Sequence, residues 1–484
     1  MKKLTDILKN TPVREVCGDT AAAIGGLVYD SRAVKPGDCF FAVPGTQSDG
    51  HDYIPMAVEK GAAAIVCERM PADAAEGVAY VLVGDSAGAM ADMAAAFCDY
   101  PSRELKLVGI TGTNGKTTTA TLLYDLVRAM GYKAGLISTV VYKIDGREVE
   151  ATHTTPDSIR LNAMMREMAD AGCAYCFMEC SSHAIVQERT RGLDFAGGIF
   201  SNITHDHLDY HKTFAEYIRA KKLFFDGLPK GAFALTNADD RNGRVMVQNT
   251  AAAVSAYSLR AMADFRCKIV EMHLDGMLLR IDGQELWVGL LGRFNAYNLL
   301  AVYGAAALLG LDRGEVLRVL SMLHAVSGRF EKIRAANGTT AIVDYAHTPD
   351  ALENVIQTIE EIRTPGQQLI VVCGCGGDRD RTKRPEMAAI AVKYATTAVF
   401  TSDNPRHESP EAILDDMVAG LEPGARYLRI ADRAEAIRTA VMLSRPGDII
   451  LVAGKGHETY QIVGDVKHPF DDREEIKKRF ALLN

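Results

Sequence analysis

The segment from Thr111 to Thr118 (TGTNGKTT) contains the residue types that point most directly to chemistry. An apolar run over 105–110 predicts a buried strand before it, and the apolar spacing over 119–130 predicts a helix after it. Glycines in such a loop let backbone N–H groups approach phosphate oxygens, a lysine adds positive charge, and a threonine hydroxyl can reach a magnesium ion. A plain strand-to-helix turn would explain the glycines but not a lysine followed by three threonines. The segment therefore predicts a nucleotide-phosphate site made of Gly112, Thr113, Asn114, Gly115, Lys116, Thr117 and Thr118.

This loop departs from the common phosphate-loop pattern G-x-x-x-x-G-K-[ST]. Position 110 is Ile, and the first glycine of the loop, Gly112, stands only three residues before Gly115. The segment still predicts phosphate binding, by a variant of the usual loop in which the two glycines stand closer together.

Glu179 ends the apolar run 175–179, which predicts a strand and places a carboxylate at the edge of a sheet near the phosphate loop. A carboxylate at the end of a buried strand is costly unless it is paired, and magnesium is a suitable partner. The alternative is a carboxylate that caps the start of a helix.

The segment 202–211 (NITHDHLDYH) holds three histidines and two aspartates. The His-x-His spacing could indicate zinc, but no cysteine lies nearby, and the phosphate loop upstream makes a magnesium–phosphate role more coherent. Lys221 and Lys222 follow in a predicted helix, where their spacing alone indicates a solvated face.

Composition restricts the class of protein. The chain has 484 residues, which predicts two to four domains, and its net charge of −8 without a strongly basic segment argues against nucleic-acid partners. No apolar run is long enough to span a bilayer, and the start lacks the apolar core of a signal peptide. The ten cysteines, including the pairs Cys173/Cys176 and Cys373/Cys375, lie in or beside apolar runs. We interpret them as buried free thiols of a cytoplasmic protein rather than as zinc ligands or disulfides.

The order of predicted elements indicates an α/β protein with three units. The first, 1–101, has strands at 39–43, 63–67 and 79–83 and a helix at 87–98. The second, 102–327, adds strands at 134–138, 197–203 and 233–236 and helices at 158–171 and 213–225, which predicts a mostly parallel sheet with ligands at the carboxyl ends of its strands. The third, 328–484, has strands at 340–345, 368–373, 398–402, 427–430 and 448–452 and a last helix at 472–480, which predicts a smaller Rossmann-like unit.

Nine motifs identify a resemblance that covers essentially the whole chain. In order they are TGTNGKTT, MECSSH, NITHDHLDYH, GRFNAYNLLA, SGRFE, VDYAHTPD, GCGGDRDRTKRP, DNPR and LVAGKGHE. Together they resemble the Mur ligases of peptidoglycan synthesis, and most of all the members that add diaminopimelate. The resemblance implies an N-terminal UDP-binding domain (1–101), a central ATP-binding domain (102–327) and a C-terminal Rossmann-like domain that binds the amino acid (328–484).

The reaction that the resemblance implies joins three small molecules. The γ-phosphate of ATP passes to a carboxylate of UDP-N-acetylmuramoyl-L-alanyl-D-glutamate, and the amine of meso-2,6-diaminopimelate then attacks the acyl phosphate. Such a reaction depends mainly on positioning and charge neutralisation. The implied enzyme is a cytoplasmic monomer without a membrane span or nucleic-acid partner. The alternatives are addition of L-lysine or another diamino acid, a folylpolyglutamate synthase-like ligase, and a nucleotide-binding regulatory module without ligase activity.

The resemblance also implies roles for residues around the phosphates. Lys116 matches the lysine on the β- and γ-phosphates, Thr117 and Glu179 match ligands of a first magnesium ion, and His207 matches a ligand of a second. Lys221 matches a lysine that CO2 converts to a carbamate, which then binds the second magnesium ion; this would replace the solvated-face interpretation. Asn298, Arg329 and Asp344 match residues that contact ATP.

The remaining matches concern the other two substrates. Those for the UDP-muramoyl dipeptide are Ser31, Thr46, Gln47, Ser48, His153, Thr154, Thr155, Ser181, Gln187 and Arg189, with His153 standing where some members carry Asn. Those for diaminopimelate are Arg379, Asp403, Asn404, Pro405, Arg406, Gly454 and Glu458. Diaminopimelate differs from lysine by one carboxylate, and an arginine fork such as Arg406 binds that group through two hydrogen bonds.

Overall fold

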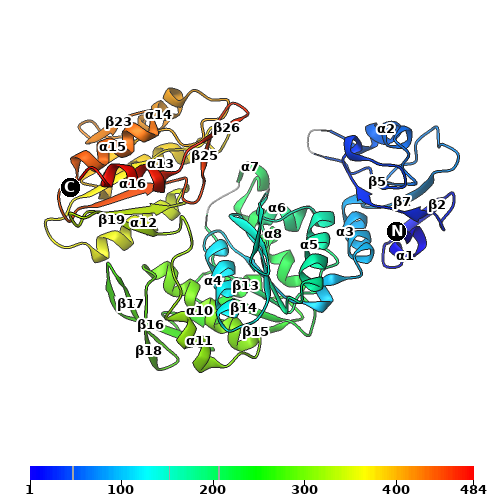
Figure 1. Ribbon diagram of the computed structural model, residues 1–484, viewed down its shortest axis with the longest axis horizontal. Helices are drawn as coiled ribbons and strands as arrows, with labels where there is room; N and C mark the ends of the chain where they lie inside the picture. The colour runs from blue at the N-terminus through cyan, green and yellow to red at the C-terminus, as the bar shows by residue number, and fades with distance from the viewer. Residues whose placement is uncertain (46–47, 152, 205–207, 484) are drawn as a thin grey trace.

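The computed structural model describes residues 1–45, 48–151, 153–204 and 208–483. Strands and helices alternate around three larger sheets, so the α/β fold class is confirmed. The central sheet lies between the two smaller ones, with the N-terminal sheet at one end of the molecule and the C-terminal sheet at the other (Figure 1).

The N-terminal unit contains a five-stranded sheet in the order β2-β7-β6-β5-β4. Strands β4 to β7 are parallel to one another and β2 is antiparallel to β7. Helix α3 is rich in alanine, which lets it pack closely against this sheet, and Asp85 caps its start. The elements are β1 (Lys2–Lys3), α1 (Leu4–Ile7), β2 (Val13–Cys17), β3 (Ala23–Ile24), β4 (Leu27–Val28), η1 (Ser31–Ala33), β5 (Cys39–Phe41), η2 (Gly50–Tyr53), α2 (Ile54–Glu59), β6 (Ala64–Cys67), β7 (Ala79–Val83), α3 (Ser86–Phe97) and η3 (Pro101–Glu104).

The central unit is built on an eleven-stranded sheet in the order β11-β10-β9-β12-β8-β13-β14-β15-β16-β17-β18. Its strands are β8 (Lys106–Thr111), β9 (Ala134–Ile137), β10 (Val141–Ile144), β11 (Arg147–Glu150), β12 (Tyr175–Glu179), β13 (Gly197–Phe200), β14 (Phe233–Asn237), β15 (Ala253–Ser258), β16 (Phe265–His273), β17 (Gly276–Ile281) and β18 (Gln284–Val288). From β9 to β16 the neighbours are parallel, and an antiparallel extension stands at each end. Strand order changes direction at β8, with β12 on one side and β13 on the other, so the carboxyl end of β8 is the switch point where such sheets bind ligands.

The helices of the central unit cover both faces of this sheet. They are α4 (Lys116–Ala129), α5 (Ser158–Asp170), α6 (Ser182–Val186), α7 (Leu208–His211), α8 (Phe214–Asp226), α9 (Gly243–Met246), α10 (Arg293–Leu308) and α11 (Arg313–Leu320). Helix α10 is buried along most of its length and packs between α4 and strands β14 to β16. Its position places the Asn298 side chain beside the start of α4.

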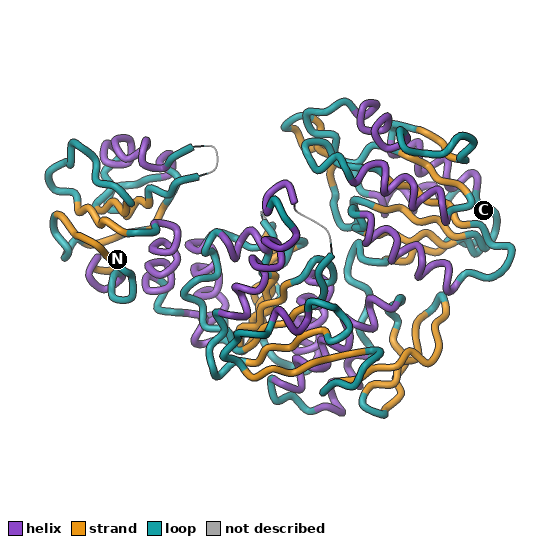
Figure 2. The backbone as a smooth tube through the Cα atoms, turned by 180° about the vertical axis from the view of Figure 1, so that it is seen from behind, coloured by secondary structure: helices purple, strands orange, loops and turns teal. Residues whose placement is uncertain are grey.

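The C-terminal unit has a six-stranded sheet in the order β19-β20-β24-β21-β22-β23, and only β19 is antiparallel to its neighbour. Its apolar side chains alternate between faces: in β21, Leu369 and Val371 pack with helices α12 to α14, whereas Ile370 and Val372 pack with α15 and α16. Figure 2 shows these helices on the two sides of the strands. The elements are β19 (Glu331–Arg334), β20 (Thr340–Asp344), α12 (Pro349–Ile362), β21 (Leu369–Cys373), α13 (Lys383–Tyr394), β22 (Thr397–Phe400), α14 (Pro410–Val418), β23 (Tyr427–Arg429), α15 (Arg433–Leu443), β24 (Ile449–Ala453), β25 (Tyr460–Val463), β26 (Val466–Pro469) and α16 (Asp472–Phe480).

Two boundaries near the phosphate loop differ from the sequence prediction. Helix α4 begins at Lys116 rather than at 119, so Lys116 and Thr117 lie in its first turn. Strand β13 ends at Phe200 rather than at 203, because the backbone and side chains of the next residues bond to the phosphate loop instead of to a strand.

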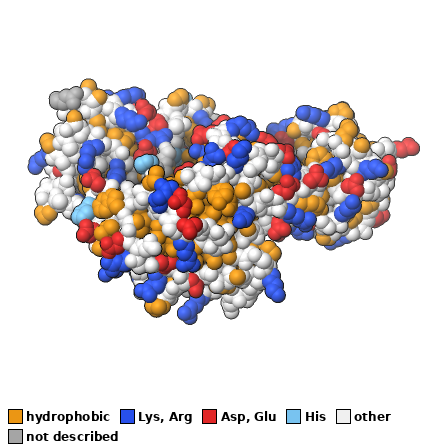
Figure 3. Space-filling model, turned by 60° about the horizontal axis from the view of Figure 1, so that its bottom comes forward, with side chains coloured by type: hydrophobic (Ala, Val, Ile, Leu, Met, Phe, Trp, Pro, Cys, Tyr) orange, Lys and Arg blue, Asp and Glu red, His pale blue; other side chains and the backbone are white. Residues whose placement is uncertain are grey.

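Other surface and core features agree with the composition. All ten cysteines are free thiols, and the pairs Cys173/Cys176 and Cys373/Cys375 are buried, as predicted. Acidic and basic side chains are interspersed on the face drawn in Figure 3. Among the described helices, none has both the length and the apolar character needed to cross a bilayer.

Candidate active site

The phosphate loop between β8 and α4 needs both of its glycines. Gly112 has φ 150°, and a Cβ there would lie 2.0 Å from Ser201 Oγ. Gly115 has φ 86°, in the left-handed region, and a Cβ there would lie 2.5 Å from Asn298 Oδ1. The loop is therefore closed tightly by its neighbours, which fixes where its backbone N–H groups point.

Residues after β13 hold the loop in place. Asn202 accepts a hydrogen bond from Thr113 N at its carbonyl oxygen (2.8 Å) and one from Asn114 N at its Oδ1 (3.0 Å). Ser201 Oγ donates to the carbonyl of Asn114 (2.6 Å). No role was predicted for either residue: Ser201 directly precedes the histidine-rich segment, and Asn202 is its first residue.

Two lysine ammonium groups meet at one carbonyl oxygen of the loop. Lys116 Nζ donates to Gly112 O (2.9 Å) and Thr113 O (2.8 Å), and Lys221 Nζ, from α8, donates to the same Gly112 O (2.8 Å). Lys221 is 1% exposed, and its Nζ lies 4.6 Å from the centroid of the Tyr217 ring. The solvated-face interpretation of Lys221 was therefore wrong, and the neighbouring Lys222 instead forms an ion pair with Asp226. Two ammonium groups so close together favour the binding of an anionic ligand beside them.

Glu179 lies one strand away from the loop. In the parallel pair β12–β8 it stands opposite Ile110, and its side chain, 1% exposed, accepts hydrogen bonds from Thr139 N (2.7 Å) and Thr139 Oγ1 (3.2 Å). It forms no ion pair with any residue that the structure describes. The helix-cap alternative is wrong, because Ser181 caps α6 by accepting from Ala184 N. A buried carboxylate in this position suits a bound cation.

The residues predicted to hold the first magnesium ion fit that role by their chemistry. Thr117 is buried in the first turn of α4 and Glu179 ends the adjacent strand β12, so both supply the hard oxygen atoms that magnesium prefers. For the second ion, Lys221 as an amine cannot act as a ligand until it is modified, and His207 lies outside the described residues, as do Thr46 and Gln47. Among the residues placed by the structure, no group of three or more His, Cys, Asp or Glu side chains is arranged around a common point.

The C-terminal unit reaches the phosphate loop through two side chains. Arg329 Nη2 donates to Thr117 Oγ1 (3.1 Å). Asp350, at the start of α12, accepts hydrogen bonds from Asn114 Nδ2 (2.8 Å) and Thr204 Oγ1 (3.3 Å), and burial raises the pKa of its carboxyl. Asp350 is the last residue of the motif VDYAHTPD, but no role was predicted for it.

Arg329 is in turn positioned by the end of β20. Asp344 accepts hydrogen bonds from Phe330 N (2.7 Å) and Ala346 N (2.8 Å), and Arg329 lies over the Tyr345 ring, 4.5 Å from its centroid. Asp344 thus fixes the backbone next to Arg329, and burial raises the pKa of its carboxyl. Arg329 and Asp344 lie together at the junction of the two units, whereas Asn298 approaches the loop from α10.

Five of the residues predicted to hold the muramoyl dipeptide form one cluster beside Glu179. Thr155 Oγ1 donates to Glu179 O (2.6 Å) and accepts from Ser181 N (3.3 Å), while Arg189 donates to Thr155 O (2.7 Å) and Gln187 Oε1 (2.6 Å). A further hydrogen bond joins Thr139 Oγ1 to Thr154 Oγ1 (3.1 Å). His153 stands at the edge of this cluster with an exposed side chain, and its backbone bonds to the Tyr142 hydroxyl.

The N-terminal unit faces this cluster. Ser31 is buried in η1, directly after Asp30, which caps it, and Tyr29. Tyr29 is 48% exposed, and its partial burial raises the pKa of its hydroxyl. Asp157 raises this pKa further and Arg189 lowers it, so Tyr29 lies near these two residues of the central unit. Tyr29 was not predicted. Ser48 lies after β5 and its carbonyl accepts from Gly45 N (2.9 Å).

An ion pair joins the N-terminal unit to the central unit. Arg191 donates to Asp92 of α3 (2.9 Å), and a Cβ on Gly88 would lie 2.3 Å from Arg191 Nη1. Gly88 therefore leaves room for the Arg191 side chain beside α3.

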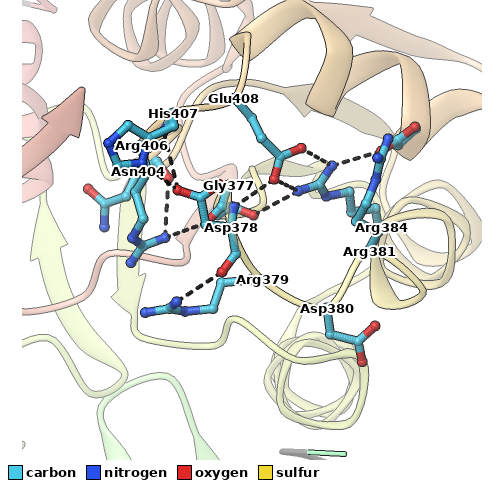
Figure 4. A network of polar contacts seen from close by, with 12 residues as sticks. Gly377, Asp378, Arg379, Asp380, Arg381, Arg384, Asn404, Arg406, His407 and Glu408 are labelled. Atoms are coloured by element: carbon cyan, nitrogen blue, oxygen red, sulfur yellow. Dashed lines mark hydrogen bonds and ion pairs between the residues drawn. The ribbon is translucent and has the colours of Figure 1, made fainter. Parts of the chain in front are cut away.

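The predicted amino-acid residues lie on adjacent loops at the carboxyl edge of the C-terminal sheet. Arg406 has φ 51° and its Nη1 donates to Gly377 O (2.8 Å). Its guanidinium lies near that of Arg379 beside the Gly377–Asp378 turn (Figure 4). Burial and the like charge of Arg379 both lower the pKa of Arg406. A pair of arginines of this kind forms a site for a carboxylate.

An ion pair made by a buried arginine holds these loops. Arg384, fully buried, donates to both carboxylate oxygens of Glu408 (2.8 and 2.9 Å) and to Gly376 O (3.2 Å). Figure 4 shows that Arg384 joins the loop after β21 to the segment that follows Arg406.

Next to Arg406 lies a second group of the predicted residues: Asp403, Asn404, Gly454 and Glu458. Asn404 Nδ2 donates to Glu458 Oε2 (2.9 Å). Gly454 has φ 116°, and a Cβ there would lie 2.4 Å from Asp403 Oδ2, so the loop after β24 passes directly against the loop after β22. The chain therefore combines an arginine pair with a carboxylate–amide pair in one place.

Comparison with known proteins shows similarity to one family along nearly the whole chain. Three domain families match in order: Mur ligase family, catalytic domain, at 23–98; Mur ligase middle domain at 110–306; and Mur ligase, glutamate ligase domain, at 328–456. The UDP-N-acetylmuramoyl-L-alanyl-D-glutamate–2,6-diaminopimelate ligase of Phocaeicola vulgatus is 55% identical over 481 residues, which is 99% of each chain. The chain belongs to the Mur ligase family.

Solved structures place this Mur ligase among relatives of the same fold. A structure of UDP-N-acetylmuramoyl-L-alanyl-D-glutamate–2,6-diaminopimelate ligase has a TM-score of 0.71 at 31% identity and covers 100% of this chain and 99% of its own. Mycobacterium tuberculosis folylpolyglutamate synthase, complexed with ADP and AMPPCP, has a TM-score of 0.62 at 18% identity and covers 75% of this chain and 91% of its own. The second likeness shows a shared fold alone.

Proposed function

We propose that this Mur ligase uses ATP to add meso-2,6-diaminopimelate to UDP-N-acetylmuramoyl-L-alanyl-D-glutamate in cytoplasmic synthesis of peptidoglycan precursors. Residues 1–101 hold the UDP part of the substrate, 102–327 hold ATP, and 328–484 hold the amino acid. The similarity to the Phocaeicola vulgatus ligase over 99% of each chain supports the proposal. Within the structure, the observation that carries it is the pairing of Arg406 and Arg379 next to Asn404 and Glu458.

This cluster, the proposed amino-acid pocket, matches the chemistry of diaminopimelate. Its distal end carries both an ammonium and a carboxylate, whereas the corresponding end of lysine carries an ammonium alone. The arginine pair suits the carboxylate, and Asn404 and Glu458 suit the ammonium. A site without the arginines would favour lysine, so the arginine pair is what supports diaminopimelate over the lysine-adding alternative.

The first chemical step depends on residues around the phosphate loop. Lys116 and the loop N–H groups bind the β- and γ-phosphates, and Arg329 adds a third source of positive charge. The cluster of Thr155, Ser181 and Arg189 holds the dipeptide so that its carboxylate oxygen approaches the γ-phosphorus. A bond forms between these two atoms, the bond to the β-phosphate oxygen breaks, and ADP is left.

The second step joins the amine. The neutral amino group of diaminopimelate attacks the acyl-phosphate carbon, the carbon–oxygen bond to phosphate breaks, and a proton leaves the nitrogen for solvent. Thr117 and Glu179 would hold one magnesium ion, and His207 with a CO2-derived carbamate on Lys221 would hold a second; the ions supply charge neutralisation of the phosphates. The protein's own part is to align the two reacting groups.

The proposal predicts that phosphate release needs all three substrates. Purified protein with ATP and magnesium should release phosphate rapidly only when both the UDP-muramoyl dipeptide and diaminopimelate are present. Comparable release without the UDP-muramoyl dipeptide would contradict the ligase assignment and support a simple nucleotide-hydrolysing module. Turnover on a folate with glutamate would support the folylpolyglutamate alternative instead.

A further inference from the structure

Lys455 is a fully buried cation inside the proposed amino-acid pocket. Its side chain is 0% exposed, in the loop directly after β24. Its Nζ donates to Asn404 Oδ1 (3.0 Å) and to Glu458 Oε2 (2.9 Å), and it lies 3.8 Å from Asp403 Oδ1. All three of these partners are residues proposed to hold the amino acid. Because Lys455 is enclosed, it acts on the substrate only through them.

The contacts of Lys455 fix the orientation of the Asn404 amide. Asn404 Oδ1 accepts from Lys455 Nζ and from Ile462 N (2.9 Å), so its Nδ2 is directed to Glu458 Oε2 (2.9 Å). Turning the amide over would place its NH2 group against two donors. Lys455 and the Ile462 N–H group therefore together determine which atom of Asn404 faces Glu458.

The same contacts give the two oxygens of the Glu458 carboxylate different surroundings. Oε2 accepts hydrogen bonds from both Lys455 and Asn404, whereas Oε1 accepts no hydrogen bond from the residues that the structure describes. The Glu458 side chain is 13% exposed, so part of it stays accessible to a ligand. Lys455 also offsets the negative charge that Asp403 and Glu458 bring close together.

We propose that Lys455 is a positioning residue for the amino-acid substrate. It holds Asn404 and Glu458 so that Glu458 Oε1 remains available to the distal ammonium of diaminopimelate, while Arg406 and Arg379 take the carboxylate. This inference rests on the proposed function of the pocket and adds to it the residue that organises its ammonium end. Removing Lys455 would take one of the two described donors from Asn404 Oδ1 and would leave Glu458 without its buried cationic partner.

The first test is the Lys455→Met variant, which keeps the length of the side chain but removes its charge and donors. We expect the KM for diaminopimelate to rise about 10- to 100-fold, because Glu458 would lose the partner that holds it in place, and the loss of one well-placed hydrogen bond to a charged substrate group weakens binding by roughly tenfold or more. The KM values for ATP and the UDP-muramoyl dipeptide, and kcat at saturating diaminopimelate, should stay within about twofold. An unchanged KM for diaminopimelate, or an equal rise in all three KM values, would overturn the proposal.

The matched control is Lys467→Met on β26. Lys467 is exposed and its Nζ lies 4.3 Å from the centroid of the Tyr460 ring, in the hairpin next to the pocket. Its replacement removes the same charge from a neighbouring element, and it should leave all three KM values unchanged. A rise in the KM for diaminopimelate equal to that of Lys455→Met would show a general charge effect and overturn the proposal.

A paired variant decides the matter even if Lys455→Met fails to fold. Lys455→Met/Glu458→Gln removes both buried charges, and its KM for diaminopimelate should match that of Glu458→Gln within about threefold, because Lys455 acts largely through Glu458. A further tenfold rise in the paired variant would mean that Lys455 contributes independently and would overturn the proposal. If Glu458→Gln and Arg406→Lys themselves leave diaminopimelate turnover unaffected, the proposed pocket fails, which is a different outcome.

Discussion

Replacement of Lys221 with alanine should lower kcat by about 10³-fold or more, since preorganised charged groups at reacting phosphates commonly contribute effects of this size. Lys221 is buried and shares Gly112 O with Lys116, so it stands where phosphate and metal charges would meet. Its proposed carbamate would change a cation into a carboxylate and supply a ligand for the second magnesium ion. Phosphate release under saturating substrates measures the loss.

If Lys221 carries a carbamate, the effect of adding small carboxylates to its variants can be predicted as well as the loss of activity. Small carboxylates such as acetate or formate should partly restore the Lys221→Ala variant, because they can occupy the space of the missing group. Lys221→Arg should be inactive and should gain nothing from them, since arginine fills the site without forming a carbamate. Lys222→Ala is the control, because the described contacts of the Lys222 side chain are with Asp226 on the same helix and not with the phosphate loop. Full activity in Lys221→Ala would contradict the account of this residue.

Replacement of Arg406 with lysine should raise the KM for diaminopimelate by about 100-fold, because lysine keeps the charge but loses the planar pair of donors. The Arg406 guanidinium already lies beside Arg379 and is held by Gly377 O (2.8 Å), so it is prepared for a carboxylate before substrate arrives. The KM for ATP should change little, because the phosphate loop lies in another unit. Steady-state kinetics with each substrate varied in turn gives both values.

Arg381→Lys is the matched control for Arg406→Lys. Arg381 belongs to the same cluster but is largely exposed and pairs with Asp416, away from the pocket (Figure 4). Its variant should keep the KM for diaminopimelate. If Arg406→Lys raised the KM for ATP and for diaminopimelate equally, Arg406 would be structural and the basis of amino-acid selection would lie elsewhere.

The sequence predicted those parts of the site that local pattern determines. The phosphate loop follows from strand, glycine loop, lysine and helix in succession, and Glu179 follows from a carboxylate at the end of an apolar run. Lys221 could not be assigned from spacing, because its burial depends on α8 packing against the loop more than a hundred residues earlier. Only the family resemblance gave it a role.

Contacts between distant segments account for the residues that were missed. Asp350 meets Asn114 across the junction of two units, with a sequence separation of 236 residues, and neither segment carries a local signal for that contact. Tyr29 and Lys455 likewise gain their surroundings only after separate elements come together. Such residues are visible only when the fold is known.

The fold itself was predicted best where strands are buried on both faces. β7 and β12 have the predicted bounds, and β20 to β22 and β24 differ from them by a residue or two, because continuous apolar runs mark such strands. The antiparallel extension from β16 to β18 was missed, since β16 mixes charged with apolar residues and half of it is exposed. Helix α10 was not predicted as a helix either, because it is apolar on nearly every side and lacks an amphipathic period.

The most direct test of the account is a comparison of amino acids at equal concentration with ATP and the UDP-muramoyl dipeptide. The arginine pair predicts that kcat/KM for meso-diaminopimelate exceeds that for L-lysine or L-ornithine by at least about 100-fold, because a site built to bind a charged group discriminates strongly against a substrate that lacks it. Equal or faster turnover with L-lysine or L-ornithine would contradict it.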